Sequence, residues 1–158
     1  MTKRIVINTG PLITLQRIEA IQTVGQLPFE FVAPEEVRAE LDAGVSVGHP
    51  QVDPAWLRIC QLRDPLSPMV LSALDLGEAA VIQLALEQKV KWVCIDEWRA
   101  RRVAHSAGLK VVGVLGLLGK AKKQGIIPAL RPLVERALQE GIRYHPELVR
   151  KVLEAAGE

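Results

Sequence analysis

The stretch RIVINTGPLITL, at residues 4–15, constrains the fold more than any other part of the sequence. An apolar run at residues 5–7 stops at the polar pair Asn8 and Thr9, and a second apolar run begins behind Pro11. This order is typical of a buried parallel strand that leads into an α-helix. Ligands bind just beyond the carboxyl ends of such strands, so Asn8 and Thr9 are predicted to mark the functional site.

Strand and helix patterns alternate along the rest of the chain. This alternation predicts right-handed crossovers and an α/β three-layer sandwich with a central parallel sheet and a helical C-terminal tail. Acidic residues at helix starts, Gly at helix ends and Pro in first turns set the expected bounds. Strands are expected at residues 29–32, 56–62, 91–97 and 111–115, and helices at 11–20 with a short continuation to 25, 34–44, 72–88, 97–107, 116–124, 128–140 and 146–156.

Length and composition indicate one well-cored domain, because the chain has 158 residues, of which 49% are hydrophobic. Residues 1–96 carry 8 Lys and Arg against 12 Asp and Glu, whereas residues 97–158 carry 12 against 6, so the two parts differ in charge. Such asymmetry suits a protein that holds a cation with one region and a polyanion with another, although solvated helix faces also produce it.

Cysteine usage and hydropathy predict a soluble cytoplasmic protein. Cys60 and Cys94 lie inside apolar runs without metal-ligand spacing, so both are expected to be reduced core residues. No signal-peptide pattern opens the chain, and no apolar run approaches the length of a membrane span.

Several acidic residues are expected to meet at the carboxyl edge of the sheet. If the first and fourth strands are adjacent, Asn8 and Asp96 with Glu97 follow neighbouring strands, and helices bring Glu40 and Glu78 to the same crevice. Carboxylates crowded together repel one another unless a cation joins them. Oxygen ligands suit Mg²⁺ or Mn²⁺, which can activate water for attack on a phosphodiester.

Each acidic residue also has a purely structural interpretation. Asp96 at a strand-to-helix junction can be a helix cap, Glu78 can be a dipole partner in a first turn, and Glu40 can be a solvated helix residue. Asp75 is expected to be the N-terminal cap of the helix that carries Glu78. The prediction of a metal site therefore depends on the whole set of residues.

A basic helix, EWRARRVAHSAG, begins at this acidic strand end. Arg99 and Arg102 share one face and are expected to hold phosphate, unless this face is only solvated. A lysine cluster on a later helix adds further positive charge. The tryptophans are expected to be packing anchors, although Trp98 beside the arginines is also placed to stack on a base. The lysines are Lys120, Lys122 and Lys123, and the other tryptophans are Trp56 and Trp92.

Other chemistries find little support in the sequence. There is no GxGxxG after a strand and no GxxxxGK[ST], which argues against nucleotide-binding folds. The three His residues show no ligand spacing, and no nucleophile-elbow motif is present. A receiver-type signalling domain needs a Lys at a late strand end, which KVVGVLG does not supply.

With these residues in place, the chain resembles a PIN domain, in particular the small prokaryotic PIN-like branch classed as a domain of unknown function. The supporting segments are INTGPLITL, APEEVRAEL, LDLGEAAVIQLAL, CIDEWRARRVAHSAGLKVVGVLGLL and AKKQGIIPALRPLVERALQEGIRYHPELVRKVLEAAG, which together cover nearly the whole chain.

The resemblance implies a metal-dependent endoribonuclease, often the toxin of a toxin–antitoxin pair of the VapBC kind. It also implies a homodimer and a small antitoxin that covers the acidic crevice; the apolar helix VGVLGLLGKA is either a surface for these contacts or part of the core. Family acidic positions fall on Asn8, Glu40, Glu78 and Asp96, with Glu97 as an additional member. Thr9 is expected to donate a hydrogen bond to water or phosphate.

Asn8 departs from the family pattern, because many PIN nucleases have Asp there. An amide offers one neutral carbonyl oxygen and should bind a hard cation more weakly. The alternative prediction is therefore a PIN-like module that binds RNA or protein and has lost efficient catalysis.

Overall fold

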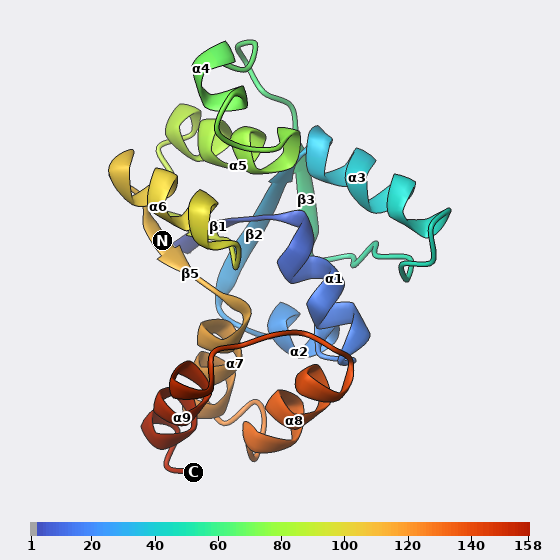
Figure 1. Cartoon of the computed structure of the whole chain (residues 1–158), viewed down its shortest axis with the longest axis vertical. Coiled ribbons are helices and arrows are strands. Elements are labelled where there is room, and N and C mark those ends of the chain that lie inside the picture. The colour runs from blue at the N-terminus through green and yellow to red at the C-terminus, as the bar shows by residue number, and fades with distance from the viewer. Residues whose placement is uncertain (1–2) are drawn as a thin grey trace.

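The computed structural model of the protein describes residues 3–158 and contains a five-stranded parallel sheet with helices on both sides (Figure 1). The strand order is β3-β2-β1-β4-β5, so the first strand of the chain lies in the centre. This is the three-layer α/β fold predicted from the sequence. The strands are β1 (Lys3–Ile7), β2 (Phe29–Pro34), β3 (Leu57–Cys60), β4 (Trp92–Cys94) and β5 (Lys110–Val112).

Helices connect successive strands, and three more follow the last strand. Figure 1 shows α5 and α6 on one side of the strands and α1 on the other, while α7, α8 and α9 group at the end of the molecule away from α4. The helices of the described residues are α1 (Thr9–Arg17), α2 (Ile21–Gly25), α3 (Glu35–Val45), α4 (Pro68–Leu71), α5 (Leu76–Glu87), α6 (Trp98–Ser106), α7 (Val114–Lys123), α8 (Arg131–Gln139) and α9 (Pro146–Ala155). No helix in residues 3–158 is long and apolar enough to cross a membrane.

Strand β1 organises the sheet because it pairs with β2 on one side and β4 on the other. Its residues Ile5, Val6 and Ile7 are almost completely buried, as expected for a strand covered on both faces. The Asn8 amide extends the β1–β4 ladder by donating to the Cys94 carbonyl at 3.0 Å. The predicted adjacency of the first and fourth strands is therefore confirmed.

The apolar helix VGVLGLLGKA forms part of the core, which is one of the two roles expected for it. Most of its apolar side chains are buried within α7, so they do not supply the contact surface that was the other expectation. Helix α7 contacts α1 and α2 on one side and α9 on another. The buried residues are Val114, Leu115, Leu117, Leu118 and Ala121.

Several predicted boundaries were wrong by a few residues because side-chain caps fix the helix starts. Helix α7 begins at Val114 rather than at residue 116, and β5 ends at Val112, because Asp96 accepts a hydrogen bond from the Val114 amide. Helix α5 begins at Leu76, as the expected Asp75 cap implies, and the pattern that starts at residue 72 is not helical before it. Strand β3 is shorter than the expected 56–62, and α8 begins later than residue 128.

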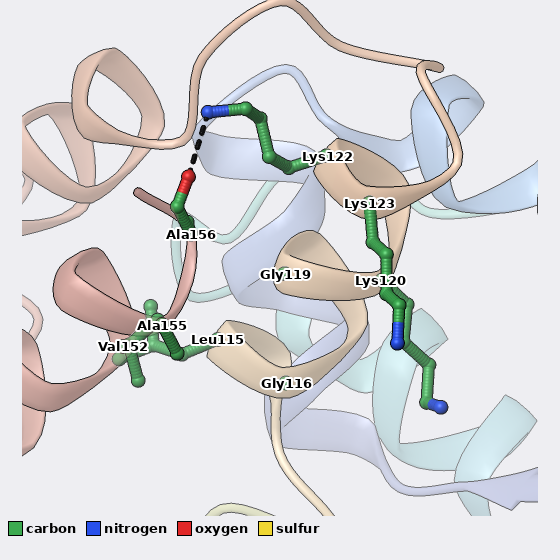
Figure 2. Close-up of a pocket in the computed structure, with 9 residues that line it drawn as sticks. All are labelled: Leu115, Gly116, Gly119, Lys120, Lys122, Lys123, Val152, Ala155 and Ala156. Atoms are coloured by element: carbon green, nitrogen blue, oxygen red, sulfur yellow. Dashed lines mark hydrogen bonds between the residues drawn. The ribbon is translucent and has the colours of Figure 1, made fainter. Parts of the chain in front are cut away.

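The end of the chain is tied to the start of α8 and to α7. The Glu158 carboxylate accepts hydrogen bonds from the Leu130 and Arg131 amides at 2.7 and 3.0 Å and from Lys122 at 2.9 Å. Lys122 also donates to the Ala156 carbonyl at 2.9 Å across a groove between α7 and α9 (Figure 2). Hydrogen bonds from the two amides, and then the hydrogen bond and charge of Lys122, lower the pKa of Glu158 to about 2.

These contacts predict that the stability contributed by Glu158 depends on pH. A carboxyl with a lowered pKa stabilises the fold above its unfolded pKa, and this contribution is lost as the pH falls through the folded value. Glu158→Gln should lower the free energy of unfolding by its largest amount above about pH 4.5. This loss should shrink as the pH falls towards about 2. Urea unfolding at several pH values measures it, with the exposed Glu154→Gln as control. A difference that stays constant with pH would contradict the assignment.

Candidate metal and phosphate site

A cavity of about 560 Å³ opens at the carboxyl edge of β1 and β4. It brings together six of the eight residues that were predicted as site residues. No Lys or Arg from the described part of the chain lines it, so its charged lining is predominantly acidic. The polar side chains in its wall are Asn8, Thr9, Glu40, His49, Asp75, Glu78, Asp96 and Glu97.

Asn8 lies at the centre of this edge, directly after β1. Its side chain is only 6% exposed, and its Oδ1 atom is buried without a hydrogen-bond partner within residues 3–158. Leaving a buried amide oxygen unpaired costs about 1–3 kcal/mol. An acceptor of this kind in a cavity wall is suited to a water, a donor group or a cation.

Glu40 reaches the cavity from α3, where Val37 and Gly44 on the same face are buried. Its carboxylate accepts a hydrogen bond from Thr9 Oγ1 at 2.5 Å and another from the Gly77 amide at 3.2 Å. Helices α1, α3 and α5 therefore meet at this carboxylate. Thr9 was expected to donate to water or phosphate, but here it donates to Glu40.

Glu78 belongs to a capping box at the start of α5. Asp75 accepts from the Glu78 amide at 2.8 Å, and Glu78 Oε1 accepts from the Asp75 amide at 3.2 Å. This confirms the predicted cap. Burial raises the pKa of Glu78; the Asp75 amide opposes this shift, and the charges of Asp75, Glu97 and Glu40 add to it.

Asp96 follows β4, and its Oδ1 atom accepts a hydrogen bond from the Val114 amide nitrogen at 3.1 Å. This bond satisfies the first backbone N–H donor of α7. Burial raises the pKa of Asp96, while the Val114 hydrogen bond and the positive charge of Arg101 oppose the shift. Arg101 is held in place by donating to the Ile95 carbonyl at 2.8 Å. The structural interpretation of Asp96 as a cap is thus correct as far as its Oδ1 atom is concerned.

Glu97 is the N-cap of α6. Its two carboxylate oxygens accept from the Arg99 and Ala100 amides at 3.1 and 2.8 Å. Hydrogen bonds within the described residues thus use both oxygens of Glu97 and of Glu40. They leave Oδ2 of Asp96, Oε2 of Glu78 and Oδ1 of Asn8 available.

The donor chemistry fits a hard divalent cation, although the side chains do not converge on one point. Within residues 3–158, no group of three or more His, Cys, Asp and Glu side chains is close enough to hold a metal ion. The amide oxygen of Asn8 is unpaired, and burial raises the pKa values of Glu78 and Asp96, so a cation bound by these oxygens would relieve the desolvation of the site. Mg²⁺ and Mn²⁺ take such oxygen ligands and keep several waters, so few direct ligands suffice.

Of the two predicted phosphate-binding arginines, Arg99 lies beside this cavity. Arg99 lines an adjoining cavity of about 390 Å³ together with Asp75, Glu78 and Glu97. Arg102 is one turn further along α6, where its guanidinium lies 4.8 Å from the Trp98 ring centroid. The lysine cluster on α7 lines the separate groove of Figure 2, where Lys120 and Lys123 point away from α9.

Sequence reasoning did not find the two glycines against which the acids pack. A Cβ at Gly77 would lie 2.1 Å from Glu40 Oε1, and a Cβ at Gly113 would lie 2.4 Å from Asp96 Oδ1. Arg101 was recognised only as part of the basic helix. The available signal was a glycine at an expected helix start, as Gly77 in LDLGE, or directly after strand residues, as Gly113 in KVVGV.

Comparison with known proteins agrees with this fold. A family model described as a PIN domain matches residues 4–158, and it belongs to a family classed as a domain of unknown function. The chain therefore belongs to the PIN domain family. This family has a nuclease-type fold, and its members typically use divalent metals. No curated protein matches the sequence.

The packing of Glu40 predicts that Gly77→Ala displaces this carboxylate. The added methyl overlaps the end of the Glu40 side chain, which must turn away and lose its hydrogen bonds from Thr9 and the Gly77 amide, each worth about 0.5–1.5 kcal/mol. Urea unfolding should show this loss. The control Gly119→Ala places its methyl in open space on α7 and should be neutral or stabilising by up to about 1 kcal/mol. Equal effects of the two substitutions would be evidence against the predicted overlap.

Proposed function

We propose that the protein is a divalent-metal-dependent endoribonuclease that hydrolyses phosphodiester bonds at the acidic cavity. The supporting observation is the cavity itself, whose wall contains five carboxylates and the unpaired Asn8 oxygen but no Lys or Arg of the described residues. Negative charge collected in this way favours a bound cation. Membership of a nuclease-type family is consistent with this chemistry.

Glu78, Asp96 and Asn8 would hold Mg²⁺ or Mn²⁺ through their available oxygens, with Glu40 as a further ligand and Glu97 supporting the site. Such an ion supplies positive charge and an activated water when bound. Glu97 keeps α6 in position by capping it, and Thr9 holds Glu40 at the cavity wall.

Arg99 and Arg102 would engage the phosphates on either side of the cleaved bond. Both are exposed, and neither forms an ion pair with a carboxylate in residues 3–158. Arginine donors that are not already paired are suited to phosphate oxygens. Their removal should weaken RNA binding at low salt most strongly.

A second candidate is a PIN-like module that binds RNA or protein without efficient cleavage. Two observations favour it: the neutral amide of Asn8, and the hydrogen bonds that already occupy both oxygens of Glu40 and Glu97. A cation would then compete with helix caps for its ligands. Direct measurement of metal binding separates the two candidates.

We extend the proposal to the partners of the protein. It acts as the toxin-like component of a toxin–antitoxin system in the cytoplasm, forms a homodimer, and has a small antitoxin partner that covers the acidic cavity. Light scattering of the purified protein, alone and with the product of any adjacent small gene, tests the homodimer and the antitoxin.

The first prediction concerns metal binding. The parent should bind Mn²⁺ in a calorimetric titration and cleave a mixed RNA pool only when Mg²⁺ or Mn²⁺ is present. Asp96→Asn should lose both properties, since it removes the charge next to the cation. Its amide oxygen can still accept from the Val114 amide, so the α7 cap and the fold should persist.

A matched control is Asp64→Asn, which lies in the exposed loop before α4. It should bind Mn²⁺ and cleave RNA like the parent. Absence of Mn²⁺ binding by a folded parent would refute the nuclease proposal and favour the binding module.

A second prediction concerns Asn8. The substitution Asn8→Asp adds a carboxylate where the buried Oδ1 is unpaired, so it should raise Mn²⁺ affinity by roughly tenfold and increase the cleavage rate. It should also lower stability in the absence of metal, because one more charge is buried among carboxylates. Calorimetry and thermal melts with and without Mn²⁺ measure both effects. Unchanged affinity would show that Asn8 does not contact the ion.

A further inference from the structure

Trp98 has the exposure of a binding residue rather than of a packing residue. It is 68% exposed, whereas Trp56 packs edge-on against Phe31 at 5.1 Å and Trp92 is half-buried beside Lys3. The packing role expected for the tryptophans is therefore wrong for Trp98, for which stacking on a base was the other role considered. An exposed indole beside a functional site is suited to contact with a partner molecule, because Trp combines a large apolar ring with a polar N–H.

The indole is held at the mouth of the acidic site. Trp98 is the first residue of α6 and directly follows Glu97, whose carboxylate caps this helix. Arg102, one turn later, lies with its guanidinium 4.8 Å from the ring centroid. This cation–π contact fixes the orientation of the ring on the helix surface.

Trp98 also forms one wall of a cavity of about 770 Å³ that includes Asp96 and Glu97. Tyr144, His145 and Leu148, from the segment that leads into α9, contribute to the same cavity. This cavity and the acidic cavity share Gly10, Asp96 and Glu97 in their walls, so the exposed ring lies in a space that adjoins the proposed reaction site. A group seated on Trp98 lies next to whatever occupies the acidic cavity.

The surrounding charge favours a polyanion. Arg101 and Arg143 line this cavity, and Arg99 and Arg102 flank the ring on α6. Three of these residues, Arg99, Arg102 and Arg143, form no ion pair with a carboxylate in residues 3–158. An aromatic face among unpaired arginines is the combination that binds single-stranded nucleic acid.

We propose that Trp98 is the stacking platform for an unpaired base of the RNA, adjacent to the phosphodiester in the acidic cavity. This inference rests on the proposed function for the identity of the ligand. A base within a duplex already stacks on both faces and is not available to the indole. Trp98 thereby selects single strands over duplexes.

The test measures binding without cleavage. A fluorescently labelled single-stranded RNA is titrated in EDTA against the parent, Trp98→Ala, Trp98→Phe and the control Leu138→Ala, and anisotropy is recorded. Trp98→Ala should weaken binding by roughly ten- to a hundredfold, because stacking is worth about 1–3 kcal/mol per base. Trp98→Phe should stay within a few-fold of the parent, and Leu138, an exposed apolar residue on α8, should have no effect.

Two further readouts distinguish stacking from a structural role. The parent should prefer the single strand over a duplex of the same sequence, and Trp98→Ala should abolish this preference. Bound RNA should quench tryptophan emission in the parent and not in Trp98→Phe. Where cleavage is measurable, Trp98→Ala should raise KM and leave kcat nearly unchanged.

The outcomes separate this inference from the proposed function. Metal-dependent cleavage by the parent with unchanged RNA affinity in Trp98→Ala would overturn the stacking role and leave the nuclease assignment intact. Weakened binding in Trp98→Ala without cleavage by any variant would support the stacking role and overturn the nuclease. Unchanged RNA binding with a loss of self-association would make this face a protein interface and refute the inference.

Discussion

The candidate site depends on one repeated interaction, in which an acidic side chain accepts hydrogen bonds from backbone amides at the start of a helix. Asp75 and Glu78 do so at α5, Glu97 at α6 and Asp96 at α7, while Glu40 accepts the Gly77 amide in the first turn of α5. Each helix start offers unpaired N–H groups and the positive end of its dipole. Several carboxylates can therefore share one cavity although no Lys or Arg of the described chain lines it.

This arrangement gives the same residues a structural role and a chemical one. The hydrogen bonds that hold Asp96 and Glu78 each engage one carboxylate oxygen and leave the other without a partner in residues 3–158. The fold can thus keep its acids in place without a cation, at the cost of raised pKa values where burial outweighs the caps. Asn8, which carries no charge, reduces the repulsion further. Stability without a cation and affinity for one are opposed in such a site.

The sequence was sufficient for the fold and for the gathering of the acidic residues. Apolar runs ending at Asn8 and Asp96 defined the strands, and parallel topology placed both residues at one edge. The orientation of side chains was not predictable, because Thr9 and the helix amides compete with a ligand for the same oxygens. The exposure of Trp98 was also missed, since an aromatic residue in a helix resembles a packing residue until its neighbours are known.

Gly77 and Gly113 carry a consequence beyond this chain. Each occupies the position where any larger residue would overlap the carboxylate of Glu40 or Asp96. The two glycines leave the space that the carboxylates occupy, although neither glycine takes part in the chemistry. In a related sequence, a side chain at either position would mean that the facing acid points elsewhere, even if every acidic residue were present. To identify such a site in other chains, one must therefore check that both positions are glycine as well as that the acidic residues are present.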